Sequence, residues 1–248
     1  MKNKIPDFAY HMTKFFTEYL PIQRNLSPNS IATYRDTFRL LLLFYDTEKH
    51  IKPNLLTLDM LDVQGIEDFM LWLKKERNCG ASTCNQRLGA LKSFFRYLQF
   101  ALPDRALQCQ ENLAIRPMKQ PEPGLKYLTI DGIKLLLEQP DIKTKYGRRD
   151  LAILSLMYDT GARVQEIADI KIVHIRFSAP ATIRITGKGD KTRVVPLLSR
   201  TEDILKQYIK DFKIDAGGND AYLFQNRNGQ HLSRFGISYI LTKYADKA

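Results

Sequence analysis

The sequence predicts a mainly helical protein of two domains, with one small β-hairpin in the second domain. Hydrophobic residues at helical spacing dominate the first hundred positions, and the spacing changes to alternation only once, near residue 182. The chain has 248 residues, of which 44% are hydrophobic, and this exceeds what one compact helical domain needs. The predicted fold class is therefore α-helical with a small β-hairpin or sheet.

The first hundred residues predict four helices with short connections, which together form a small bundle. The expected helices cover residues 8–20, 28–45, 57–75 and 83–98. Ser27 suits the N-cap of the second helix and Pro28 its first position, because that position needs no backbone donor. Thr57 is the expected cap of the third helix, and Ser82 or Thr83 begins the fourth.

A stretch with three prolines and a closing glycine, residues 115–124, follows the helical region. Proline removes a backbone donor and blocks helix continuation, so this stretch predicts an extended linker. We therefore expect a helical domain at residues 1–112, a linker at residues 113–126 and a second domain at residues 127–248.

The second domain is expected to contain helices on both sides of a β-hairpin. Thr129 can cap its first helix, and an apolar helix over residues 149–158 breaks before Gly161 and resumes at Ala162. Two alternating runs around the turn Gly-Lys-Gly-Asp predict the hairpin. The hairpin strands are expected at residues 182–186 and 191–197, and further helices at 201–212 and 233–244.

The formal net charge of +11 favours a polyanionic partner, of which nucleic acid is the commonest. A basic surface that serves only solubility is the alternative. Cys79, Cys84 and Cys109 lack the spacing of a metal finger, which predicts reduced thiols and no metal site. No run of about 18 apolar residues occurs, and the first residues lack the apolar stretch of a signal peptide. We therefore expect a cytoplasmic protein.

Two segments carry the chemistry. The first is Tyr-Asp-Thr-Gly-Ala-Arg-Val-Gln-Glu-Ile, residues 158–167, and the second is Ile-Thr-Gly-Lys-Gly-Asp-Lys-Thr-Arg-Val-Val-Pro-Leu, residues 185–197. In this order they resemble the catalytic domain of the tyrosine recombinase (phage integrase) family. The Ser-Pro-Asn-Ser start of the second helix and the proline-rich linker are similar to the family's N-terminal core-binding domain. The resemblance covers nearly the whole chain.

The resemblance implies a role for each of three residues. Arg163 would bind the scissile phosphate, and its planar fork suits two parallel hydrogen bonds to phosphate oxygens. Lys188, at the hairpin tip, would act as the general acid if nearby positive charge lowers its pKa. A solvated hairpin tip is the alternative for Lys188. Glu166, one turn after Arg163, would orient the arginine, with a surface salt bridge as the alternative.

The resemblance also implies a DNA-binding surface on both domains. In the helical domain, polar and basic residues on the second and fourth helices have counterparts that face DNA, so that the two domains would clamp the duplex. The expected DNA contacts are Asn29, Ser30, Tyr34, Thr83, Asn85, Arg87, Lys92 and Arg96, together with Lys191 and Arg193 of the hairpin. A solvated helix face is the alternative for any one of them.

The sequence departs from the family after the hairpin. The family continues with a His-x-x-Arg motif and a late nucleophilic tyrosine, and His231-Leu-Ser-Arg234 is the one match to that motif. We reject this match, because the surrounding residues are similar to the helix that precedes the true motif. Tyr239 and Tyr244 follow too soon after Arg234 to be the nucleophile. We therefore expect the chain to be C-terminally truncated relative to the family.

The resulting hypothesis is a site-specific recombinase or integrase of a mobile element or phage, acting through a 3′-phosphotyrosine without metal or nucleotide cofactor. The polypeptide itself is expected to bind double-stranded DNA but not to cleave it, and to be monomeric where full-length relatives form tetramers on DNA. Bacterial nucleoid association would follow. A non-catalytic DNA-binding regulator or accessory factor with the same domains is the alternative, and a helical protein-interaction module is a weaker one.

Overall fold

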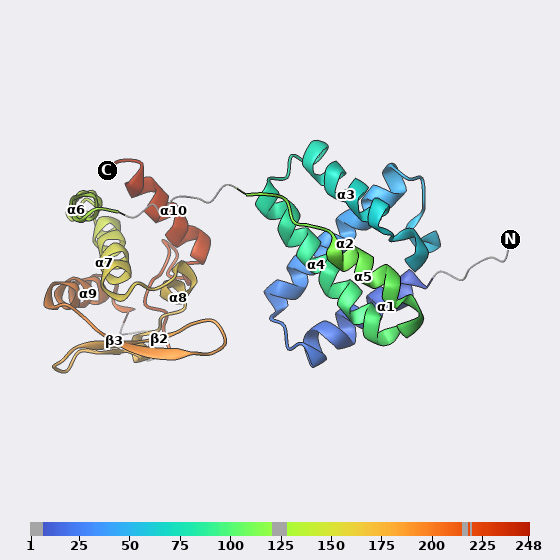
Figure 1. The fold of residues 1–248 in the computed structure, drawn as a ribbon. Helices are drawn as coiled ribbons and strands as arrows, with labels where there is room; N and C mark the ends of the chain where they lie inside the picture. Colours follow the sequence, from blue (N-terminus) through green and yellow to red (C-terminus); the bar gives the residue numbers. More distant parts are fainter. Residues whose placement is uncertain (1–6, 121–127, 215–217, 219) are drawn as a thin grey trace. The chain divides into compact units, whose positions relative to one another are not determined.

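The computed structural model describes residues 7–120, 128–214, 218 and 220–248. The chain divides into two compact units, Met1–Gly124 and Leu125–Ala248, each with its own hydrophobic core (Figure 1). Helices dominate both units, and the second also holds a small antiparallel sheet. This confirms the predicted fold class. Among the described residues, no helix is long and apolar enough to cross a membrane.

The first unit is a bundle of helices joined by short turns. Its elements are α1 (Phe8–Lys14), a π-helix (Phe15–Gln23), α2 (Pro28–Thr47), two 3-10 turns (Pro53–Leu55 and Leu58–Met60), α3 (Val63–Lys75), α4 (Ala81–Ala101), a further 3-10 turn (Pro103–Arg105) and α5 (Ala106–Ala114). The Ser27 hydroxyl accepts a hydrogen bond from the Ser30 N–H at 3.3 Å, and Pro28 is the first residue of α2. The predicted start of the second helix is thus confirmed.

Aromatic rings form the centre of the first unit. Phe15, Phe38 and Phe94 come from three different helices, and all three side chains are buried. The ring centroids of Phe15 and Phe94 lie 5.2 Å apart, as do those of Phe38 and Phe94, and both pairs meet edge to face. Such contacts add specific geometry to apolar burial. They fix α2 and α4 side by side, and these two helices carry the expected DNA contacts.

The predicted starts of the third and fourth helices are wrong. Thr57 precedes a 3-10 turn, and α3 begins only after Asp62, whose carboxylate accepts the Gly65 N–H at 2.7 Å. The Tyr45 hydroxyl donates to the Met60 carbonyl at 2.6 Å, and this tertiary contact holds the intervening turn. Helix α4 begins after Gly80, without a side-chain cap, rather than at Ser82 or Thr83.

A fifth helix, α5, was not predicted, and it extends the first unit beyond residue 112. Asn112 of α5 is fully buried and donates to the Leu61 carbonyl at 2.9 Å. Helix α5 ends at Ala114, and Ile115 is buried in the core of this unit. The first two residues of the expected linker, 113–126, therefore belong to α5, residues 115–120 follow it without regular structure, and residues 121–126 lie outside the described residues.

The second unit combines helices with a three-stranded sheet. Its elements are α6 (Ile130–Glu138), α7 (Lys145–Thr160), α8 (Val164–Ala168), a 3-10 turn (Ile172–His174), β1 (Ile175–Arg176), β2 (Thr182–Thr186), β3 (Thr192–Pro196), α9 (Ser199–Phe212) and α10 (Arg234–Ala245). The strands pair antiparallel in the order β1-β2-β3, and Ile185 of β2 faces Arg193 of β3. Thr129 caps α6, as the sequence predicts, and α10 follows Ser233, whose hydroxyl accepts the Gly236 N–H.

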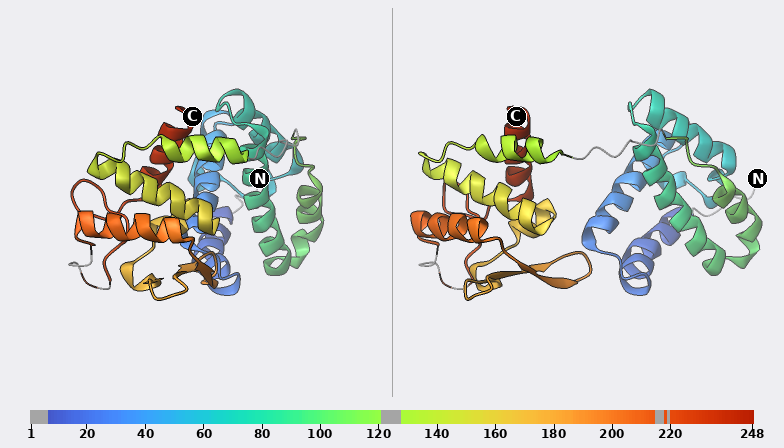
Figure 2. Two further views of the ribbon diagram at one scale, coloured as in Figure 1. Left: turned by 90° about the vertical axis from the view of Figure 1, so that its left-hand side faces the viewer. Right: turned by 60° about the vertical axis from the view of Figure 1, so that its left-hand side comes forward.

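The core of the second unit lies between α7, α9 and α10. Ile153, Leu205 and Ile237, one from each helix, are completely buried. Figure 2 shows α7 and α9 side by side, with α6 and the β2–β3 hairpin at opposite ends of this unit. Strand β2 turns Ile183 and Ile185 into the same core. The hairpin is thereby held at its base, while its turn lies at the surface.

Candidate functional site

Arg163 lies at the break between α7 and α8. Gly161 closes α7 in the left-handed region, with φ of 57°, which a glycine adopts without steric cost. Two residues later, Arg163 is the N-cap of α8 in an extended conformation. The chain therefore turns sharply in the Thr-Gly-Ala-Arg segment, and 76% of the Arg163 side chain is exposed to solvent.

The buried carboxylate of Glu166 holds Arg163 in place. Only 5% of its side chain is exposed. Its Oε1 accepts a bond from Arg163 Nη1 at 3.0 Å, and its Oε2 accepts the Arg163 backbone N–H at 3.0 Å. Arg193 Nη2 also donates to Oε2, at 2.8 Å. The hydrogen bond from Arg193, helped by those from Arg163 and opposed by burial, lowers the pKa of Glu166 to about 2.

The turn that carries Lys188 begins against the same carboxylate. A Cβ atom at Gly187 would lie 2.5 Å from Glu166 Oε1, so only glycine fits there without a shift. The Gly187 N–H donates to the Lys191 carbonyl at 2.9 Å and closes the turn. Lys188 is exposed, and its ammonium has no hydrogen bond or ion pair within the described part of the chain. The structure thus brings Arg163 and the hairpin turn to one carboxylate.

Arg193 has a partner inside the protein that the sequence analysis did not foresee. Its guanidinium forms an ion pair with the Glu166 carboxylate, and 39% of its side chain remains exposed. Lys191, by contrast, is exposed at the end of the turn. The expected DNA contact by Arg193 stays a prediction. The structure adds that Arg193 links β3 to the start of α8 through Glu166.

Tyr244 is engaged in a second buried network. Its ring is only 4% exposed, and its hydroxyl donates to Asp150 Oδ2 at 2.9 Å. Burial, followed by the bond to Asp150, raises the pKa of the Tyr244 hydroxyl to about 12. Arg149 donates to the other Asp150 oxygen at 2.7 Å and 3.0 Å. Sequence reasoning missed Asp150, because nothing in the surrounding apolar helix marks a buried acid.

Tyr239 and His231 have different surroundings. The Tyr239 ring lies on the outer face of α10 and is 70% exposed. The His231 ring stacks on Tyr222, with centroids 4.1 Å apart, and its Nε2 lies 2.9 Å from the Ala168 carbonyl oxygen. Arg234 is the first residue of α10, and its guanidinium lies over the Phe235 ring. His231 is therefore occupied at the end of α8 rather than turned toward Arg163.

The residues expected to contact DNA in the first unit lie on two helices, α2 and α4. Asn29 is exposed in the first turn of α2, and Tyr34 stacks on Phe15 with centroids 6.4 Å apart. On α4, the Asn85 side chain is hydrogen-bonded to the backbone of Met118, which follows α5. The Lys92 ammonium is hydrogen-bonded to the carbonyl of Leu113, in the last turn of α5. The others are Ser30, which contacts the Ser27 hydroxyl, Thr83 and Arg87, which are partly exposed, and Arg96, which is exposed.

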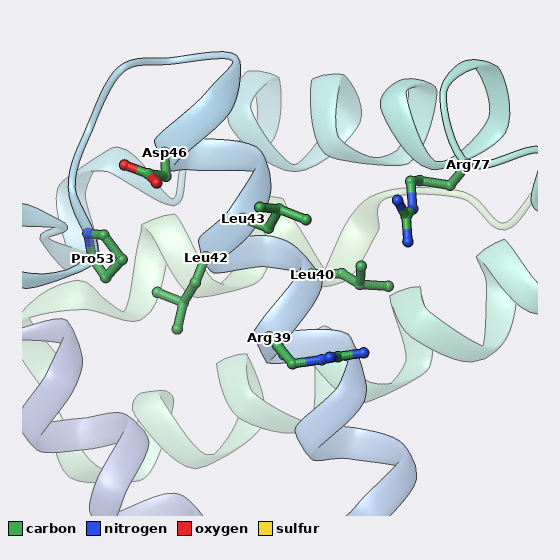
Figure 3. Close-up of a pocket in the computed structure, with 7 residues that line it drawn as sticks. All are labelled: Arg39, Leu40, Leu42, Leu43, Asp46, Pro53 and Arg77. Carbon is green, nitrogen blue, oxygen red and sulfur yellow. The ribbon is translucent and has the colours of Figure 1, made fainter.

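A pocket of about 360 Å³ opens on the first unit, and none of these residues lines it (Figure 3). It is lined by Arg39, Leu40, Leu42, Leu43 and Asp46 of α2, by Pro53 and by Arg77. None of these residues was expected at the site. Within the described residues, no group of three or more His, Cys, Asp or Glu side chains could hold a metal ion, and the three cysteines are free.

Comparisons with known proteins identify the family of both units. The family model described as "Phage integrase family" matches residues 126–248, and that of the "Phage integrase, N-terminal SAM-like domain" matches residues 14–100. The integrase/recombinase y4rC of Sinorhizobium fredii is 34% identical over 233 residues, which cover 94% of this chain and 69% of that protein. The tyrosine recombinase XerD of Listeria monocytogenes is 31% identical, over 94% of this chain and 76% of XerD.

Solved structures share the fold. The recombinase XerH bound to its difH substrate matches with a TM-score of 0.64 and 21% identity, over 91% of this chain and 65% of XerH. A lambda integrase tetramer bound to a Holliday junction matches with a TM-score of 0.67 and 14% identity, over 96% of this chain and 62% of that integrase. The chain belongs to the tyrosine recombinase (phage integrase) family, with an N-terminal SAM-like core-binding domain.

Proposed function

We propose that this polypeptide binds double-stranded DNA as part of a site-specific recombinase or integrase, and that Arg163 binds the scissile phosphate. The observation that carries the proposal is the carboxylate of Glu166, which is buried and yet presents an exposed arginine to solvent. A buried acid costs free energy to desolvate, and paired arginines offset that cost. The arrangement orients a charge outward, which suits a ligand that is itself an anion.

Lys188 is the proposed general acid, which would protonate the departing 5′ oxygen. Its turn starts at Gly187, against the same carboxylate that holds Arg163. A positioned donor near the leaving oxygen contributes on the order of 10²–10⁴ in rate. The Arg193 guanidinium is hydrogen-bonded to the Glu166 carboxylate. We therefore assign both residues a positioning role toward the two proposed catalytic groups.

DNA contacts outside this site are assigned to exposed or partly exposed groups on both units. On α2 these are Asn29, Ser30 and Tyr34, and on α4 they are Thr83, Arg87 and Arg96, while Lys191 serves in the hairpin. The net charge of +11 supports such a surface. Relatives of known structure are solved with DNA, as a XerH–difH complex and as a lambda integrase tetramer on a Holliday junction. Tetramer formation on DNA by the full recombinase is proposed on this likeness.

The polypeptide is proposed to bind DNA without cleaving it. Tyr244 is buried and donates a hydrogen bond to Asp150, and a phenol with a raised pKa is a poor nucleophile near neutral pH. Tyr239 is exposed on α10, but no base contacts its hydroxyl within the described residues. A non-catalytic DNA-binding regulator built on the same domains would share this property.

The test uses the polypeptide with a nicked suicide duplex. We expect a non-covalent complex and no adduct that survives denaturation. An adduct that disappears in Tyr239→Phe or Tyr244→Phe would show that cleavage occurs. For the role of Arg163, the affinity for duplex DNA is measured against salt concentration. Arg163→Ala should lower the slope of log affinity against log salt by about 0.9, the value for one phosphate contact.

The matched control is Lys210→Ala, which removes the same charge from an exposed position on α9. It should leave the slope unchanged. An equal decrease of the slope in both variants would mean that only net charge matters. The proposed contact between Arg163 and a phosphate would then be refuted. Absence of salt-dependent binding would favour a protein-interaction module instead.

A further inference from the structure

The chain that leaves α5 returns along α4 and is held there at two points. Lys92 Nζ donates to the Leu113 carbonyl at 2.7 Å, and Asn85 lies two turns earlier on α4, beside Met118. Residues 115–118, here called the strap, lie between these contacts and follow α4 in the reverse direction. In Figure 1 the strap is part of the green trace that runs from α5 back along α4.

Asn85 grips the strap with both ends of its side-chain amide. Its Nδ2 donates to the Met118 carbonyl at 2.9 Å, and its Oδ1 accepts the Met118 N–H at 2.8 Å. This two-point pairing fixes the backbone of Met118 as a neighbouring strand would. It uses one donor of Nδ2 and one lone pair of Oδ1, and so turns the amide toward the strap.

Lys92 uses its ammonium in a similar way. The Leu113 carbonyl belongs to the last turn of α5, where carbonyl groups lack a partner within the helix. Burial, followed by the charge of Arg96, lowers the pKa of the Lys92 ammonium. Between the two contacts Ile115 is buried in the first core, and Met118 packs against it. The strap is thus anchored by polar and apolar contacts together.

The two contacts decide where the chain leaves the first unit. Without them the chain would leave the first unit at the end of α5, near Lys92. With them it leaves this unit after Met118, beside the first turns of α4, which is roughly 10 Å further along that helix. Thr83 and Arg87, two of the proposed DNA contacts, lie in these first turns. The strap therefore brings the origin of the connection to the proposed DNA-binding end of α4.

We propose that Asn85 and Lys92 are positioning residues of the DNA-binding protein, which fix the point of departure of the second unit rather than contact DNA. The expected effect on DNA binding rests on the proposed function, but the strap itself can be tested without DNA. Releasing the strap would lengthen the connection between the units by four residues, from residues 119–129 to residues 115–129. Because effective concentration falls as about the −3/2 power of length, we expect roughly twofold weaker DNA binding.

Hydrogen exchange of residues 115–118 in the intact chain tests the strap. Asn85→Leu and Lys92→Met should each speed exchange of the Met118 amide, by on the order of tenfold for Asn85→Leu, which removes two hydrogen bonds. Lys92→Arg keeps a donor and should retain most of the protection. The thermal unfolding of all variants is measured to show that α4 and α5 remain folded. Unchanged exchange in both Asn85→Leu and Lys92→Met would overturn the proposal.

The salt dependence of DNA binding tests the assignment. Lys92→Met should weaken binding about twofold without changing the salt slope, whereas Arg96→Met, one turn away, should lower the slope by about 0.9. A drop in slope for Lys92→Met equal to that for Arg96→Met would make Lys92 a phosphate contact and end the proposal, while the proposed function would stand. Absence of DNA binding by the unsubstituted chain would instead refute the proposed function and the positioning role, whatever the exchange data show.

Discussion

The carboxylates of Glu166 and Asp150 are about equally buried, with 5% and 4% of their side chains exposed, but their arginine partners differ. Arg163, which Glu166 holds, is 76% exposed, whereas Arg149, which Asp150 holds, is 11% exposed. Asp150 also accepts the Tyr244 hydroxyl and so connects α7 with α10 inside the unit. The exposure of the partner, and not the burial of the acid, therefore distinguishes the proposed ligand site from a structural network.

The largest effect is expected at Asp150. Asp150→Ala removes the carboxylate that accepts from the buried Arg149 guanidinium and from the Tyr244 hydroxyl, and breaking a buried pair from one side costs about 3–5 kcal/mol. Urea unfolding followed by circular dichroism measures this loss. The control is Asp169→Ala, an exposed acid at the end of α8, which should stay within about 0.5 kcal/mol of the unsubstituted protein. Equal losses at both positions would contradict the structural role of Asp150.

A smaller, pH-dependent effect is expected at Glu166. Its pKa in the folded state, about 2, lies below the ordinary value of 4.5, so its contribution is present above about pH 4.5 and is lost as the pH falls toward 2. Its arginine partners reach solvent, which screens the interaction, and we expect about 2 kcal/mol at neutral pH. Glu166→Gln should remove this part of the acid limb when stability is measured between pH 7 and pH 2.5. An acid limb that is identical in Glu166→Gln would mean that the carboxylate is not held by its arginines.

The smallest effect concerns the approach of the hairpin to Glu166. Gly187→Ala would place a Cβ 2.5 Å from Glu166 Oε1, and the required shift should cost about 1–2 kcal/mol. Gly189→Ala is the matched control, because its Cβ would meet open space although its φ of 73° makes alanine strained by about 1 kcal/mol. Only Gly187→Ala should also raise the pH at which the Glu166 contribution is lost. If both substitutions left the acid limb unchanged, the contact between turn and carboxylate would be refuted.

The sequence predicted those elements whose signals are local. Ser27 and Thr129 cap their helices as expected, because an N-cap needs only its own side chain and an N–H three residues later. The hairpin also follows from alternation and a glycine-rich turn. The predicted cap at Thr57 is wrong, because Asp62, a few residues later, is an equally good cap. Which of the two residues begins the helix depends on the distant Tyr45 hydroxyl, which holds the turn between them.

The elements that sequence reasoning missed depend on tertiary contacts. Helix α5 has nine residues, and it is held by contacts such as the buried Asn112 with the Leu61 carbonyl. Strand β1 has two residues, too few to show alternation. The role of Asn85 could not be separated from a DNA contact, because an amide on a polar helix face has the same pattern whether its partner is a base or a backbone 33 residues away.

At the site, the family resemblance named Arg163, Lys188 and Glu166 but not their connection. That Glu166 also receives Arg193 depends on how β3 packs against α8, and no spacing along the chain encodes it. The spacing of three between Arg163 and Glu166 was a usable signal, since residues three apart in a first helical turn can contact each other.

The attachment of Arg163 also sets the direction from which a ligand can arrive. Only its Nη1 is used by Glu166, and its backbone N–H is bonded to the other oxygen of the same acid. Within the described residues, the edge formed by Nε and Nη2 has no protein acceptor. A guanidinium fastened at one corner offers the opposite edge, with two parallel donors, to the solvent. An oxyanion can therefore reach this group edge-on, at Nε and Nη2, from the side remote from the buried acid.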